Sequence, residues 1–141
     1  MSETALAATY KALRTALTGG SESWATRAYP DIAPEGVARP YVVFGWAGGG
    51  EANEVRRQDA SLIISVKVVA DTMTASMAGA VRLSELLNDQ GEQESNTITG
   101  GTFWEISTIT QERAVHLVEQ FGNAKPIYHD GHIFRFRLEA K

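Results

Sequence analysis

The sequence contains no cysteine, and this absence removes several classes of chemistry at once. Disulfide cross-links, catalysis by a thiolate and zinc sites built on cysteine all require that residue. The sequence also lacks a continuous apolar stretch of about 20 residues, the length that a membrane-spanning helix needs. Its first residues, MSETALAATYKALRTAL, have no apolar segment of the kind found in secretion signals. We therefore expect a protein that stays in the cytoplasm until it assembles into a larger structure.

Positive charge is also scarce. The chain has 13 lysine and arginine residues against 17 aspartate and glutamate residues, which gives a formal net charge of −4. Proteins that bind nucleic acid regardless of its sequence obtain their affinity from basic side chains placed on phosphates. The charge balance therefore argues against such a role for this chain.

The remaining composition is that of an ordinary globular protein, with 43% hydrophobic and 21% charged residues. A length of 141 residues fits a single domain, residues 1–141, with one hydrophobic core. The spacing of apolar residues predicts a first helix, which begins at a cap formed by Ser2 or Thr4 and ends at Gly19-Gly20. Its buried stripe is Leu6, Tyr10, Leu13 and Leu17. A second helix is expected over residues 71–91, with a stripe made of Met73, Met77, Ala80, Val81 and Leu87.

Strands are predicted where β-branched and aromatic residues cluster or alternate with polar ones, over residues 41–46, 61–70 and 132–140. Val66 and Phe136 are expected to face the core, and Arg135 to face solvent. Two more extended runs cover residues 97–110 and 113–121, and a short edge strand is expected around residues 24–29. Because the strands are grouped, we predict an α+β fold. It has a mainly antiparallel β-sheet, two α-helices packed on one face and a long projecting hairpin loop.

The glycine-rich stretch FGWAGGGEANEVRRQDAS, residues 44–61, is the first candidate for a functional site. A phosphate-binding P-loop needs a lysine and a serine or threonine after its last glycine, whereas Gly50 is followed by the acidic Glu51. The stretch also lacks the G-x-G-x-x-G spacing of dinucleotide-binding proteins. Both phosphate-binding interpretations are therefore excluded.

Residues 47–60 are instead predicted to form a long loop, because the stretch exceeds a tight turn and structureless loops beyond about 12–15 residues are usually functional or disordered. One interpretation is a solvated hairpin tip. The other is an arm that contacts a partner protein, with Trp46 as its anchor, flexible glycines and paired charges. The predicted partner-binding residues are Trp46, Gly48, Gly49, Gly50, Glu51, Glu54, Arg56 and Arg57.

The motif YHDGHIF places His129, Asp130 and His132 close together in the sequence. These residue types can bind a metal, but Asp-Gly is also the preferred pair of a type I′ hairpin turn. We favour the turn, because no further cluster of ligands is visible, and we expect neither a metal nor another cofactor. The G-x-S-x-G and H-E-x-x-H motifs are absent, and nothing supports Glu105 or Glu112 as a general acid. A small metal-dependent enzyme is therefore the least supported interpretation, and we expect no enzymatic activity.

The segments ALRTAL, YPDIAP and RPYVVFG are followed by a charged stretch, the strand LIISVKVVA, a helix ending in LSELLND and the closing GHIFRFRLEA. In this order, the segments resemble the tail-completion or tail-terminator proteins of long-tailed bacteriophages. The resemblance spans residues 6–138 and is most specific in RPYVVFG, residues 39–45, and in the closing strand. It includes no catalytic motif, and the stretch 91–101 is longer than the family pattern.

The resemblance implies a structural role in the virion, in its tail or neck region. Such proteins form a hexameric ring on the last ring of tail-tube subunits, stop tube growth and present a surface to the head-side connector. DNA passes through the central hole without specific binding. The implied partners are other copies of the chain, the tail tube protein and a connector or neck protein, with no membrane. A neck or head–tail connector component is the alternative, because it shares this size and composition.

An acidic stretch lies between Arg82 and Arg113, where no basic residue occurs. One interpretation is a solvated face, which needs no function. The other is a surface that must not retain DNA, because each cation on a phosphate adds affinity. In a ring, Glu92 and Glu94 are the residues of this stretch that we predict to face the lumen.

Overall fold

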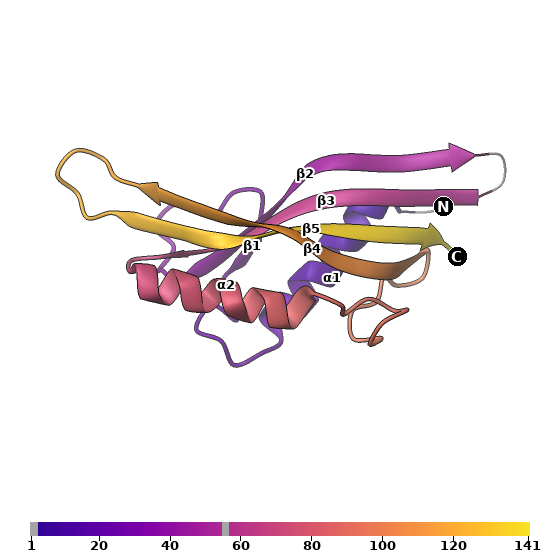
Figure 1. The fold of residues 1–141 in the computed structure, drawn as a ribbon, viewed down its shortest axis with the longest axis horizontal. Coiled ribbons are helices and arrows are strands. Elements are labelled where there is room, and N and C mark those ends of the chain that lie inside the picture. The colour runs from indigo at the N-terminus through magenta and orange to yellow at the C-terminus, as the bar shows by residue number, and fades with distance from the viewer. Residues whose placement is uncertain (1–2, 55–56) are drawn as a thin grey trace.

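The computed structural model describes residues 3–54 and 57–141, whose strands form one sheet accompanied by two helices (Figure 1). The elements, in chain order, are α1 (Ala5–Thr18), β1 (Ala28–Pro30), β2 (Tyr41–Glu54), β3 (Arg57–Ala70), α2 (Met73–Leu87), β4 (Trp104–Glu119) and β5 (Ile127–Ala140). Within the sheet the strand order is β1-β2-β3-β5-β4. Strands β1 and β2 pair in parallel, and the other neighbouring strands pair in the antiparallel direction. The predicted α+β class is confirmed.

The strand predictions near the two edges need revision. The short edge strand near residues 24–29 exists as β1, at residues 28–30, where it pairs with residues 42–44 of β2. Residues 104–110 and 113–119 of the two predicted runs belong to one long strand, β4, whereas residues 97–103 and 120–121 lie outside it. Two irregularities, at Ile106/Thr108 and Gln111/Arg113, interrupt its pairing with β5 and shift the register.

The core lies between one face of the sheet and both helices. Along β3 and β5, Ile64, Val66, Phe134 and Phe136 are fully buried, while Arg137 on the opposite face is exposed. The predicted inward residues of these strands are therefore confirmed. Helix α1 contributes Leu13 and Leu17 of its predicted stripe to this core, together with smaller residues, and Leu6 and Tyr10 are partly buried against it.

The helix starts follow the predicted capping chemistry. Thr4 Oγ1 accepts a hydrogen bond of 3.1 Å from the Ala7 N–H at the start of α1, as expected from the sequence. Thr72 Oγ1 accepts one of 3.2 Å from the Ala75 N–H at the start of α2.

The predicted buried stripe of α2 is wrong except for Leu87. The helix buries Ser76, Gly79, Leu83 and Leu87, and leaves three of the predicted core residues exposed: Met73 at 47%, Met77 at 46% and Val81 at 61%. A Cβ added to Gly79 would lie 2.7 Å from Cγ2 of Val68. The helix therefore approaches β3 too closely for a larger side chain, and small residues form its contact face.

The predicted turn at Asp130-Gly131 is also wrong, because both residues lie inside β5. Gly131 pairs with Lys67 of β3 on one side and with Val115 of β4 on the other. A Cβ at Gly131 would lie 2.0 Å from the carbonyl oxygen of Val66, so this position requires a residue without a side chain. The β4–β5 connection is residues 120–126.

The long loop predicted over residues 47–60 is largely strand. The β2–β3 pairing continues from Gly48 opposite Ile63 to Glu54 opposite Arg57, after an irregularity between Trp46 and Gly48. Gly49 has a φ of 80°, which favours glycine, and its strand position contradicts the flexibility expected for the glycine run. On its other side, β3 pairs with β5 as far as Asp59 opposite Glu139.

Truncation of Phe136 to alanine tests the assignment of the inward face. Phe136 is fully buried, so its loss should lower the free energy of unfolding by about 3–5 kcal/mol. Urea unfolding followed by circular dichroism would measure this change. Arg137→Ala, on the exposed face of the same strand, is the control and should stay within about 0.5 kcal/mol of the wild type. A loss below about 1 kcal/mol for Phe136→Ala would contradict the assignment.

Candidate functional site

The base of the β2–β3 hairpin is built on a hydrogen-bonded link between helix α1 and strand β2. Tyr10 of α1 accepts a 2.8 Å bond at Oη from the backbone N–H of Trp46 and donates a 2.9 Å bond to Asp31 Oδ1. Its ring meets that of Phe44 edge-on, with centroids 5.2 Å apart. Burial and the neighbouring Asp31 carboxylate raise the pKa of Tyr10, so the phenol stays protonated as a donor.

Trp46 is therefore fixed through its backbone while its side chain is 55% exposed. An exposed tryptophan on a rigid strand loses little conformational freedom when a partner covers it, which is typical of interface anchors. The sequence identified Trp46, but it gave no indication of Tyr10 and Asp31, because both lie far away in the chain.

The remaining residues of the predicted arm fall into three groups. Gly48, Gly49 and Gly50 lie in β2, opposite Ile63, Leu62 and Ser61 of β3. Glu51, Glu54 and Arg57 are placed by their backbone pairing alone, since their side chains lie outside the described part of the structure. Arg56 lies outside the described residues. A partner-binding role for this set stays a prediction.

The segment after α2 covers the outer edge of β4. Backbone amides of Asp89, Glu92 and Gln93 donate to the carbonyls of Ile109, Ile106 and Ser107. The segment lies so close to β4 that a Cβ at Gly91 would be 2.7 Å from the Ser107 carbonyl oxygen. Gly91 therefore serves this close approach and does not end the helix as predicted, because α2 ends at Leu87.

Three side chains of the same segment satisfy amides of β4. Glu92 Oε2 accepts a 2.6 Å bond from the Ile106 N–H, Glu94 Oε1 accepts a 2.8 Å bond from the Ile109 N–H, and Asn88 Oδ1 accepts a 2.9 Å bond from the Gln111 N–H. Burial, with Asp89 nearby, raises the pKa of Glu94. Glu92 and Glu94 thus stabilise the fold from within one chain, and a lumen-facing position for them stays a prediction.

Replacement of Glu92 measures what this covering contributes. Glu92→Ala would leave the amides of Ile106 and Gly100 without their acceptor, so we expect the free energy of unfolding to fall by about 1–3 kcal/mol. Glu92→Gln keeps an acceptor oxygen and should lose less. Urea unfolding of both variants gives the comparison. Equal stability of the alanine variant and the wild type would show that water replaces the carboxylate.

The histidines and aspartate of YHDGHIF do not come together. Because side chains alternate along β5, His129 lies on the face away from the helices, while Asp130 and His132 lie on the helix side. His132 Nε2 lies 2.9 Å from the Ala80 carbonyl oxygen of α2. Within residues 3–54 and 57–141, excluding the side chains of 51–58, no group of three metal-ligating side chains occurs.

Asp130 instead joins two residues that the sequence did not suggest. Its buried carboxylate accepts a hydrogen bond from the Ser76 hydroxyl on α2, and its Oδ1 lies 2.5 Å from His116 Nδ1 on β4. The aspartate stands between the serine and the histidine, so the histidine cannot take the serine proton as the base of a catalytic triad does. The cluster ties α2 to the sheet.

His129 is buried on the open face of the sheet, where Nε2 lies against Glu119 Oε1. Burial, followed by the charge of Lys67, lowers the pKa of His129 despite this glutamate. As the pH falls through about 6.5, the ordinary pKa of histidine, the unfolded chain therefore binds a proton at His129, whereas the folded chain keeps this side chain neutral. This contribution to stability is present above pH 6.5 and is lost as the pH falls through the lowered pKa.

We therefore expect the melting temperature to fall between pH 7 and pH 5, in part because of His129. His129→Gln removes the titrating group and should reduce this fall, as measured by calorimetry at several pH values. His116 and His132 are unchanged in the variant, so the difference between the two profiles belongs to residue 129. An unchanged pH profile would show that another group causes it.

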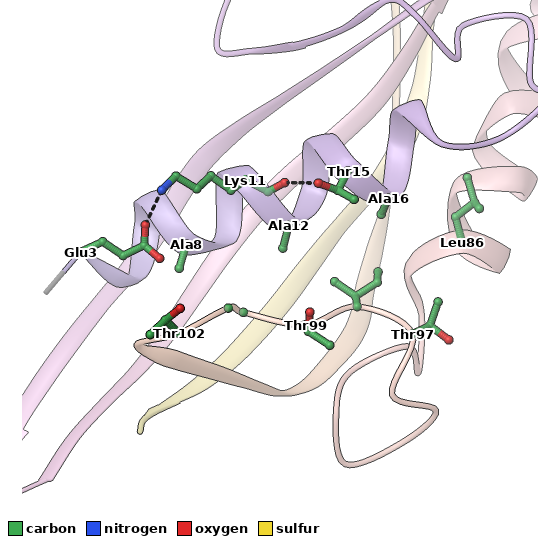
Figure 2. Close-up of a pocket in the computed structure, with 13 residues that line it drawn as sticks. Glu3, Ala8, Lys11, Ala12, Thr15, Ala16, Leu86, Thr97, Thr99 and Thr102 are labelled. Carbon is green, nitrogen blue, oxygen red and sulfur yellow. Dashed lines mark hydrogen bonds and ion pairs between the residues drawn. The ribbon is translucent and has the colours of Figure 1, made fainter.

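A groove lies between α1 and residues 97–102, with a volume of about 500 Å³ (Figure 2). Figure 2 shows Ala8, Ala12 and Ala16 facing Thr99 and Thr102 across it. At one end, Lys11 Nζ pairs with Glu3 Oε2 at 2.7 Å. Most of its other lining residues are alanines, threonines and glycines.

Comparison with known proteins bears on the fold. No protein-family model and no curated protein matches the sequence. Among solved structures, the chain is similar to a chain of the "Virion of native gene transfer agent (GTA) particle", with a TM-score of 0.63 and 20% identity. The match covers 96% of this chain and 95% of that chain. The chain therefore shares its fold, from end to end, with a chain of a virion particle.

The two helices that the described residues form are both too short or too polar to cross a bilayer.

Proposed function

We propose that this chain is a structural protein of a phage-like virion, and within that class a tail terminator. The observation that carries the proposal is the end-to-end fold match with a chain of the gene transfer agent virion. A match over 96% of one chain and 95% of the other involves the whole protein and not a common substructure.

The finer assignment draws on the family resemblance. Its two most specific segments form the beginning of β2 and most of β5, which flank β3 in the middle of the sheet. The resemblance therefore falls on residues that build the fold shared with the virion chain. The sequence pattern and the structural comparison point to the same class of protein from independent observations.

The surface also suits assembly. Trp46, Ile32 and Phe121 are 55%, 82% and 71% exposed, and α2 presents Met73, Met77 and Val81 to solvent. Exposed large apolar residues of this kind mark surfaces that a partner covers. In the proposed role the partners are further copies in a hexameric ring, the tail tube and the head-side connector. No catalytic activity, cofactor or membrane belongs to this role.

A neck or head–tail connector protein is the second candidate, because the same virion chain and the same exposed residues fit it. The two roles differ in the partner on which each protein acts. A terminator acts on the tail tube alone, whereas a neck protein acts only when the head-side connector is present.

Shortening of the β2–β3 hairpin tests the proposed contact with the tube. Glu51 and Ala60 are register partners, so residues 52–59 can be replaced by Asn-Gly, the preferred two-residue hairpin turn. The variant should melt within about 4 °C of the wild type, since the core is untouched. It should fail to stop the growth of tail tubes, whose lengths are measured by negative-stain electron microscopy.

Lys125→Ala, an exposed residue in the connection of the other hairpin, is the control and should stop tube growth normally. If the shortened variant stops growth as the wild type does, the hairpin is only a solvated tip. If the wild-type protein leaves tube lengths unchanged but joins finished tails to heads, the neck role replaces the terminator role.

A further inference from the structure

The outer edge of β4 is covered along its first half only. Residues 88–94 satisfy its backbone from Ile106 to Gln111. From Arg113 to Glu119, the described residues place no strand or segment on that side. An uncovered strand edge presents amides and carbonyls that pair readily with another strand. We call this stretch, residues 113–119, the open half of β4.

The open half has a sequence that complements itself in the antiparallel direction. When two copies pair with His116 opposite His116, Arg113 of each copy faces Glu119 of the other on the side away from the helices. On the same side, Val115 faces Leu117 of the second copy, which pairs apolar side chains. Both kinds of cross-strand pair are stabilising.

The side that faces the helices also fits. In this register Ala114 lies opposite Val118 of the second copy, so a small residue faces a larger one. Ala114, His116 and Val118 are exposed, so this side of β4 is accessible, although α2 reaches Asp130 of the neighbouring β5 through Ser76.

Other registers lose this agreement. A shift by two residues places Arg113 opposite Leu117 or Phe121 and leaves its charge without a partner. A shift by one residue exchanges the two faces, because side chains alternate along a strand.

We propose that two copies of this chain associate through the open half of β4, as an antiparallel strand pair with twofold symmetry. The contact differs from those of a ring, which are not twofold, and it does not depend on the proposed function. One strand pair is smaller than a standard protein interface, so the dimer is weak and forms with increasing concentration. It covers an edge that would otherwise bind unrelated strands.

A charge exchange tests the pairing by sedimentation velocity over a range of protein concentrations. Arg113→Glu places two glutamates opposite each other in both symmetry-related pairs, and should weaken the dimer about tenfold. Glu119→Arg should weaken it similarly by placing arginines opposite each other. An equimolar mixture of the two variants restores opposite charges in every pair and should dimerise as the wild type does.

Arg137→Glu is the control, because it makes the same charge change on the same face but on β5, inside the sheet. It should leave the association unchanged. Glu119→Arg also removes the contact with His129, so melting temperatures are measured for every variant, and Arg113→Glu leaves that contact intact.

Three results would overturn the proposal. The first is a wild-type protein that stays monomeric at all concentrations. The second is a dimer or larger assembly that Arg113→Glu does not weaken. The third is a mixture of the two variants that associates no better than either alone.

Discussion

The alternation of side chains along β3 is the constraint on which the rest of the structure depends. β3 lies between β2 and β5, and its residues Leu62, Ile64, Val66 and Val68 are buried beneath both helices. A slip by one residue would turn all of them to the open face, so the register of both neighbouring strands is determined by this burial.

Three glycines serve the close packing around β3. A Cβ at Gly49 of β2 would lie 2.0 Å from the Ser61 carbonyl oxygen, one at Gly79 of α2 would lie 2.7 Å from Val68, and one at Gly131 of β5 would lie 2.0 Å from the Val66 carbonyl oxygen. Each neighbour of β3 therefore approaches it at a position that no other residue can occupy without displacement. These three glycines therefore serve packing.

The features that could be predicted from the sequence are those with a local pattern. The inward residues of β3 and β5, the cap at Thr4 and the α+β class all follow from periodicity or from neighbouring residues. The contact face of α2, the position of Asp130-Gly131 and the strand at Gly48–Gly50 do not, because each is decided by contact with β3. By local preference, Met73 and Met77 suit a core better than Ser76 does, and the pair Asp130-Gly131 suits a turn better than a strand. The distant contact outweighs the local preference in both cases.

The same limit applies to the candidate site. The exposure of Trp46 beside the glycine run could be expected. The hydrogen bond that the Trp46 N–H donates to Tyr10, and the one that Tyr10 donates to Asp31, could not. The acidic residues Glu92 and Glu94 were identified by their charge, yet their contacts are with backbone amides of β4. Figure 1 shows the two hairpins extending from opposite ends of the sheet.

The covering of β4 by residues 88–94 makes one strand behave as two. By its place in the sheet β4 is an edge strand, yet the amides of Ile106, Ile109 and Gln111 are bonded as firmly as those of a strand with neighbours on both sides. Amide hydrogens exchange with solvent at rates set by the opening of such bonds. Slow exchange will therefore extend to the outer edge of the sheet and end abruptly within β4, at the residue where the covering segment leaves it.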